Sequence, residues 1–146
     1  MRSGVLVPLA TLIVLPGCAD PDPDPSPSTC VTGVSTACAA QYDPPIYPTI
    51  FEKILHPTCA AGTGTCHSAD AAQGGLVFED ADQAYATLLG TEGQRARVVA
   101  GDAACSLLVE RLEASDAAKR MPPGPEPLTE GERCTIVQWI AAGAAR

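Results

Sequence analysis

Two cysteines and one histidine lie close together in the stretch TCAAGTGTCHS, residues 58–68. Two thiols can add to the vinyl groups of a haem, and an imidazole next to the second thiol can ligate the iron from the same turn. Cys59, Cys66 and His67 supply these groups. The six residues between the cysteines are small and include two glycines, so the loop can bulge and leave its ends close together. A Cys59–Cys66 disulfide, or a zinc site without a clear fourth ligand, is the alternative.

Met121, in the stretch KRMPPGP, is a further residue that could ligate iron. A thioether is a soft axial ligand, and a His/Met pair raises the reduction potential of a haem. Neighbouring prolines would hold this methionine in a stiff loop, although an isolated methionine more often fills a core or a loop. His56, the only other histidine, is expected at an exposed helix end rather than at a metal.

The overall composition of the chain excludes one class of function and indicates how a small domain would be stabilised. The chain has 146 residues, a net charge of −8 and a pI near 4.5. An acidic chain of this kind lacks the basic face that nucleic-acid binding requires. Aromatic residues make up only 4% of the sequence, so a small domain of this composition needs disulfides, a metal or a cofactor to stabilise it.

The N-terminus has the pattern of an export signal. MRSGVLVPLATLIVLPGC begins with Arg2 and continues with an apolar run that is too short to span a bilayer comfortably. Its end, LPGC, resembles the lipobox of bacterial lipoproteins, in which the residue matching Cys18 is lipidated and becomes the new N-terminus. An ordinary cleaved signal followed by a nearby cysteine is the alternative. The resemblance implies a chain that is lipid-anchored to a membrane of the cell envelope, on its periplasmic or outer-membrane side.

These features divide the chain into three parts. Residues 1–17 are the predicted signal peptide, residues 18–46 the lipidated cysteine and a linker, and residues 47–146 one domain. The linker contains ADPDPDPSPST, whose alternating prolines favour an extended polyproline II conformation with nothing apolar to bury.

Six cysteines remain if Cys18 carries lipid, and export would place them in an oxidising compartment. An even number suits disulfide pairing. Besides Cys59 and Cys66, a local loop closed by Cys30 and Cys38 is expected. A Cys105–Cys134 disulfide would join the last two predicted helices.

Apolar residues at helical spacing predict four short helices and no strand series. We expect one helix from about Pro48, capped by Thr49 and ended by Pro57. The others are expected at residues 81–89 between Asp80 and Gly90, at residues 104–113 after Asp102, and after the capping box Thr129-x-x-Glu132 with Gly143 at the end and Trp139 over one edge. The predicted fold class is therefore a small all-α domain, with long loops that a cofactor or disulfides must order.

The order of these pieces carries a resemblance to a known family. From about Tyr47 to Ala144 the chain resembles class I c-type cytochromes, and most of all the compact domain often called planctomycete-type cytochrome c. The matching pieces are IFEKILHPTC, CHSADAAQGGL, AYATLLG, RVVAGDAACSLLVERL, RMPPGPEPLTEGE and IVQWIAAGA. The resemblance implies haem c attached to Cys59 and Cys66, with His67 as the proximal iron ligand and Met121 as the distal one. The Cys59–Cys66 spacing departs from the family pattern.

Two functions follow as expectations. The first is a lipoprotein with a single c-type haem that transfers one electron at a time and is not an enzyme. Its acidic surface would favour a basic redox partner through electrostatic steering. The second is a haem-free module of the same fold, stabilised by disulfides, with a structural or binding role at the cell surface.

Overall fold

The computed structural model describes residues 30–61, 65–91 and 96–146. The predicted signal peptide, the predicted lipidation at Cys18 and residues 18–29 of the predicted linker lie outside this part of the chain.

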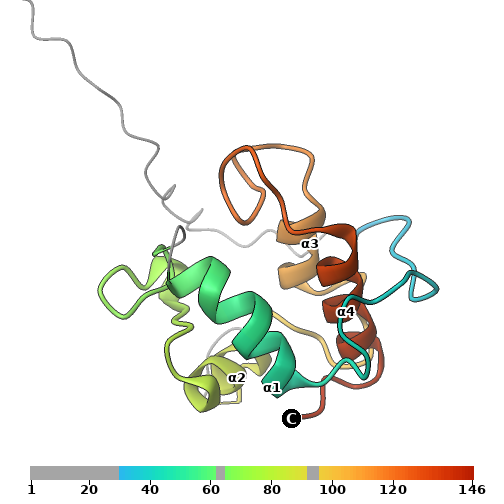
Figure 1. The fold of residues 1–146 in the computed structure, drawn as a ribbon, viewed down its shortest axis with the longest axis horizontal. Coiled ribbons are helices and arrows are strands. Elements are labelled where there is room, and N and C mark those ends of the chain that lie inside the picture. The colour runs from blue at the N-terminus through green and yellow to red at the C-terminus, as the bar shows by residue number, and fades with distance from the viewer. Residues whose placement is uncertain (1–29, 62–64, 92–95) are drawn as a thin grey trace, which may run out of the picture.

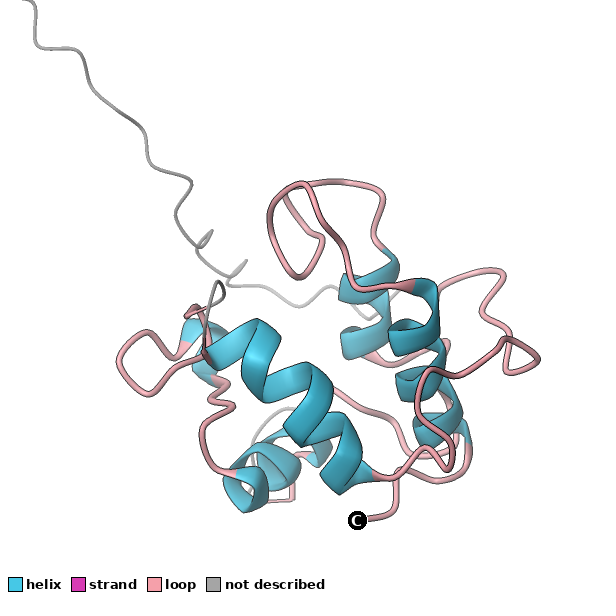
Figure 2. Cartoon of the chain, viewed as in Figure 1, coloured by secondary structure: helices cyan, strands magenta, loops and turns pink. Residues whose placement is uncertain are grey.

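Helices and long loops make up the described residues, which contain no strand (Figure 1, Figure 2). The elements are α1 (Tyr47–Ile50), η1 (Phe51–Ala60), η2 (Gln73–Gly75), α2 (Ala81–Leu89), α3 (Leu107–Glu113) and α4 (Glu130–Ala141). The rod formed by α1 and η1 crosses the molecule, with α2 at one side and the pair of α3 and α4 at the other (Figure 1). The predicted all-α fold class is confirmed. No helix in the described residues is long and apolar enough to cross a membrane.

The first helix is longer than predicted because Pro57 does not end it. The chain runs from α1 directly into η1, a π-helical segment that contains Pro57 and extends to Ala60. Proline lacks an N–H and clashes with the carbonyl of the preceding α-helical turn, and the wider π-helical turn provides a different hydrogen-bond register. The predicted cap at Thr49 is also wrong, since the N-cap is Ile46, without a side-chain hydrogen bond.

An aromatic cluster joins α1, α2 and α4 at the centre of the core. The ring of Tyr47, 1% exposed, lies 4.9 Å from that of Tyr85 and 5.5 Å from that of Trp139. Trp139 is only 2% exposed, so the prediction that it covers an edge is wrong. The reason is the C-terminal tail, which folds back so that the Ala145 carbonyl accepts a 2.7 Å hydrogen bond from Trp139 Nε1 and the Ala144 carbonyl a 2.9 Å bond from Tyr85 Oη.

The predicted boundaries of α2 are confirmed. Asp80 Oδ1 accepts hydrogen bonds from the backbone N–H groups of Asp82, at 3.0 Å, and Gln83, at 2.8 Å. Gly90 ends the helix with φ of 67°, a left-handed conformation that costs glycine little.

Helix α3 begins at Leu107 rather than at the predicted residue 104. Asp102 caps the turn before the helix, where its Oδ1 accepts a 3.1 Å hydrogen bond from Cys105 N. Ser106 Oγ donates to the Asp102 carbonyl at 2.7 Å and accepts from Val99 N at 2.9 Å. These bonds hold residues 102–106 as a tight turn, which delays the start of the helix.

Helix α4 has the predicted capping box. Thr129 Oγ1 accepts a 3.2 Å hydrogen bond from Glu132 N, and the Glu132 carboxylate accepts one of 2.8 Å from Thr129 N. Ile136, Val137 and Ile140 are buried, as predicted.

Replacing Thr129 with alanine is expected to lower the free energy of unfolding by about 1 kcal/mol, since the N-terminal N–H groups of α4 lose their acceptor. Urea titration followed by circular dichroism measures this loss. Glu126→Ala, a change at an exposed residue of the preceding loop, is the control and should leave the unfolding midpoint within error of the wild type. Equal midpoints for both variants would contradict the capping role.

Two disulfides between cysteines of the described residues join distant parts of the chain, and both predicted pairings are wrong. Cys30 is bonded to Cys105, and Cys38 to Cys134. Spacing along the sequence does not determine disulfide connectivity, because the partners are chosen by the tertiary fold. The segment of residues 30–46, which we call the strap, is thereby attached across the start of α3 and along α4.

Hydrogen bonds hold the strap to α4 as well. Gln41 N donates to the Gly131 carbonyl at 2.9 Å and lies 3.0 Å from Thr135 Oγ1. Gln138 Nε2 donates to the carbonyls of Thr36 and Cys38, both at 3.0 Å. Structured chain therefore begins at least as early as residue 30.

Candidate functional site

His67 is held at its backbone by two neighbouring segments. Its N–H donates a 3.0 Å hydrogen bond to the carbonyl of Cys59, at the end of η1, and its carbonyl accepts one of 2.8 Å from Phe78 N. The first bond brings the two ends of the intervening loop together, as the small residues of AAGTGT predict. Residues 62–64 of that loop lie outside the described part of the chain.

The His67 ring is oriented by a backbone carbonyl. Nδ1 lies 3.1 Å from the carbonyl oxygen of Leu76, and the Phe78 ring packs edge-on at 5.4 Å. A carbonyl can only accept, so this contact places the proton on Nδ1 and leaves the lone pair on Nε2. Burial lowers the pKa of His67, which also favours the neutral ring. A neutral imidazole whose other nitrogen is fixed in this way is the usual form of a metal-ligating histidine.

The turn that supplies the Leu76 carbonyl is stabilised from two sides. Gln73 N donates a 2.9 Å hydrogen bond to the Cys66 carbonyl, and Gly74 has φ of 64°, which suits glycine. Arg97 reaches over this turn from the loop after α2. Its guanidinium donates to the carbonyl of Gly74 and, at 3.2 Å, to that of Thr87. The turn after His67 is thereby tied to α2.

The two cysteines near His67 differ in state. Cys59 is the free cysteine among the described residues, and burial raises the pKa of its thiol to about 12. Cys66 is not a free thiol. A Cys59–Cys66 disulfide, one of the predicted alternatives, is therefore contradicted. The described residues also contain no group of three or more metal-ligating His, Cys, Asp or Glu side chains of the kind that zinc requires.

The raised pKa of Cys59 predicts low thiol reactivity in the haem-free chain. At pH 8 the thiolate fraction of a thiol with a pKa of about 12 is about 1,000-fold smaller than that of a thiol with the ordinary value of 9.0. Iodoacetamide is therefore expected to alkylate Cys59 about 1,000-fold more slowly in the folded protein than in urea, as measured by mass spectrometry after proteolysis. Similar rates in both conditions would show that the thiol is not buried.

Met121 lies on a separate loop, between α3 and α4, and is half-buried. Its N–H donates a 2.9 Å hydrogen bond to the Arg111 carbonyl at the end of α3. In Figure 1 this loop extends beyond α3, whereas the loop that carries His67 lies beside the end of η1. The structure thus brings Cys59 and His67 into contact through the backbone, while Met121 is positioned by α3.

His56 is the second histidine, and its surroundings differ from the prediction of an exposed helix end. It lies within η1 and is half-buried, with its ring 5.8 Å from that of Phe51. Its carbonyl accepts a 3.0 Å hydrogen bond from Ala61 N. These contacts assign it a role in packing the end of η1.

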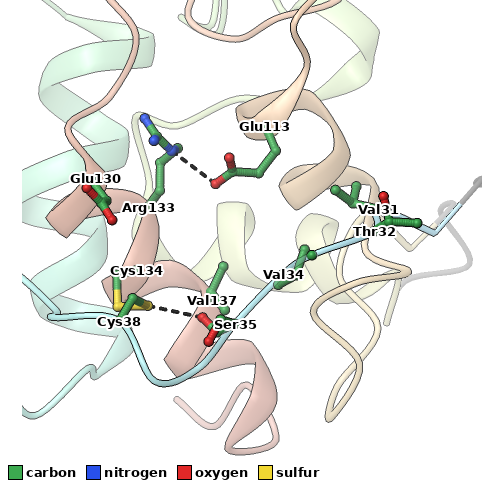
Figure 3. Close-up of a pocket in the computed structure, with 11 residues that line it drawn as sticks. Val31, Thr32, Val34, Ser35, Cys38, Glu113, Glu130, Arg133, Cys134 and Val137 are labelled. Carbon is green, nitrogen blue, oxygen red and sulfur yellow. Dashed lines mark hydrogen bonds and ion pairs between the residues drawn. A yellow bond between two sulfur atoms is a disulfide. The ribbon is translucent and has the colours of Figure 1, made fainter.

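A hollow of about 300 Å³ lies away from His67, between the strap and the facing ends of α3 and α4 (Figure 3). Arg133 crosses it to form a 3.0 Å ion pair with Glu113, and the Cys38–Cys134 disulfide lies at its wall. Its remaining lining comes from Val31, Thr32, Gly33, Val34, Ser35, Glu130 and Val137. The strap, rather than the histidine site, forms this hollow.

Sequence reasoning missed the groups that orient His67. The Leu76 carbonyl has no sequence signature, because any residue could supply it. The double glycine before Leu76 predicts a turn, and this was the available signal. Arg97 lies 30 residues from His67, and only the fold brings it to the turn.

Comparisons with known proteins agree with the helical fold. Residues 64–125 match a family model described as Planctomycete cytochrome C. These residues include Cys66, His67 and Met121, whereas Cys59 precedes them. No curated protein and no solved structure matches the chain. Over residues 64–125 the chain is thus similar to the planctomycete cytochrome C family.

Proposed function

We propose that this chain is a cell-envelope lipoprotein that binds one c-type haem and transfers single electrons. The observation that carries the proposal is the Nδ1 contact of His67 with the Leu76 carbonyl at 3.1 Å. This contact leaves Nε2 as the donor atom for iron, and His67 follows Cys66 directly, as an attachment site requires. The haem, when bound, supplies the one-electron couple of its iron.

The residues present fit a haem in three respects. His67 offers a neutral, oriented imidazole, Cys59 a reduced thiol, and Arg120 a buried Nε–H group that has no partner among the described residues. A haem brings an iron, two vinyl groups and two carboxylates, which match these groups chemically. Attachment at Cys59 and Cys66 would additionally require the Cys66 thiol to be free, which it is not in this structure.

Met121 is the proposed distal ligand. Replacing it with alanine is expected to abolish the thioether–iron charge-transfer band of the oxidised protein and to lower the reduction potential, because a His/Met pair favours the reduced iron. Absorption spectroscopy at red wavelengths measures the charge-transfer band, and potentiometric titration measures the reduction potential. An unchanged spectrum would rule out Met121 as a ligand, whatever the role of His67.

The two disulfides support export, since such bonds persist in oxidising compartments. The lipid anchor is proposed from LPGC alone, with Cys18 as the modified residue. Removal of residues 1–17 would take away Arg2 and change the net charge from −8 to −9, which favours a basic redox partner. Labelling with a fatty-acid probe should mark the wild type and not Cys18→Ala. A label on both would contradict the anchor at this residue.

The direct test of the haem is a purified protein from a host that attaches haem c. We expect a Soret band, a pyridine haemochrome spectrum and a mass increase of one haem on the unfolded chain. A colourless product of unmodified mass would contradict the proposal. It would favour the alternative, a haem-free module held by its disulfides, for which the bonded state of Cys66 is the supporting observation.

A further inference from the structure

Arg120 has a buried donor that nothing in the described part of the chain satisfies. Its Nη2 donates to the Gly124 carbonyl, which holds the guanidinium against the loop. Its backbone N–H donates a 2.9 Å hydrogen bond to the Asp116 carbonyl. Its Nε is buried and has no hydrogen-bond partner.

A buried, unpaired guanidinium N–H is unfavourable, because arginine remains charged and folding removes the water that would solvate this atom. Native proteins satisfy almost all such groups with protein, water or a bound ligand. The ion pairs that the described residues form are Arg133 with Glu113 and Arg146 with Asp82, so no carboxylate of this part of the chain pairs with Arg120. The group is therefore suited to an acceptor that the described residues do not supply.

The position of Arg120 next to Met121 indicates which chemical group this acceptor is. Arg120 directly precedes Met121, and consecutive Cα atoms are about 3.8 Å apart. The hydrogen bond from Met121 N to the Arg111 carbonyl fixes the loop at this point. An acceptor at the Arg120 guanidinium thus meets the same loop that carries Met121. A haem held at Met121 carries carboxylates on its edge, and arginine binds carboxylates through directed, charge-assisted hydrogen bonds.

We propose that Arg120 is a cofactor-binding residue whose Nε–H donates to a propionate carboxylate of the haem. This inference rests on the proposed function. It adds a residue that the family resemblance did not assign, and it explains the one buried side-chain donor without a partner among the described residues.

The test compares Arg120→Gln with Lys119→Gln in the haem-bearing protein. Lys119 is the adjacent residue, it is exposed, and its replacement removes the same charge from the same loop. We expect Arg120→Gln to lower the reduction potential clearly more than Lys119→Gln does, since the loss of a cation at a propionate stabilises the oxidised iron. The two shifts are measured by spectroelectrochemical titration, with the haem content fixed by the pyridine haemochrome.

Salt provides a second readout that a general charge effect would not reproduce. At about 1 M salt the Debye length is ~3 Å, so the Lys119→Gln shift should disappear, whereas that of Arg120→Gln should persist because the contact is buried. If Arg120→Gln does not accumulate, Arg120→Lys keeps the charge but loses Nε–H. It should then shift both the potential and the propionate bending band in the resonance Raman spectrum.

Equal shifts for the two glutamine variants, or a shift at Arg120 that vanishes at high salt, would overturn the assignment while the haem proposal stands. An unchanged potential and Raman band in Arg120→Lys would do the same. A colourless wild type would overturn both proposals together, so the two failures are distinguishable.

Discussion

Replacing His67 with alanine is expected to remove the low-spin haem spectrum and to lower the yield of haem-bearing protein by about 100-fold or more. Loss of an outer hydrogen-bond partner of a metal ligand already costs 10–100-fold in metal affinity, so loss of the ligand itself should cost at least the upper value. His67 is placed for this role by three bonds: from its N–H to the Cys59 carbonyl, from Phe78 N to its own carbonyl, and from Nδ1 to the Leu76 carbonyl. Haem content and the Soret band of the purified variant measure the effect.

The chain contains a matched control for this experiment. His56 is the only other histidine, and its ring packs on Phe51 within η1. His56→Ala should keep the wild-type spectrum and lose only some stability. Equal loss of haem in both variants would show that the effect is one of folding, and an unchanged His67→Ala spectrum would exclude His67 as the ligand.

Removing the Cys38–Cys134 disulfide is expected to lower the free energy of unfolding by about 4 kcal/mol. The two disulfides together close a ring of 39 residues, which consists of residues 30–38 and residues 105–134. Opening this ring frees the unfolded chain, and a loop of this length corresponds to about 4 kcal/mol in the chain-entropy account. Urea titration of Cys38→Ser/Cys134→Ser at fixed pH measures the loss.

The ring also predicts that the Cys30–Cys105 disulfide contributes a similar free energy of unfolding. Opening either bond releases the same ring, so Cys30→Ser/Cys105→Ser should lose a similar amount. Ala37→Ser is the control, because it changes an exposed strap residue next to Cys38 and leaves both bonds intact. A loss below about 1 kcal/mol in both double variants would mean that the strap contributes little to stability.

Local signals in the sequence predicted helices well where the stabilising contacts are local. Asp80, Gly90 and the Thr129–Glu132 capping box act within one turn of the chain, and the structure has them as predicted. The prediction that Pro57 ends the first helix was wrong. The proline rule applies to α-helical hydrogen bonds, whereas this segment adopts a π-helical register. The predicted position of Trp139 at an edge was wrong, because its burial depends on the C-terminal tail that folds back over it.

The sequence by itself determined the helical class, the N-caps of α2 and α4 and the Cys66-His67 pair, because side-chain spacing and cap chemistry act over a few residues. Tertiary structure decided which cysteines pair, since bonding depends on the distance between sulfur atoms in space. It also decided how His67 is oriented, because the Leu76 carbonyl and the Arg97 guanidinium reach this site only when the loops around α2 fold together. The buried Nε of Arg120 became apparent only there as well, since burial of a single atom depends on everything packed around it.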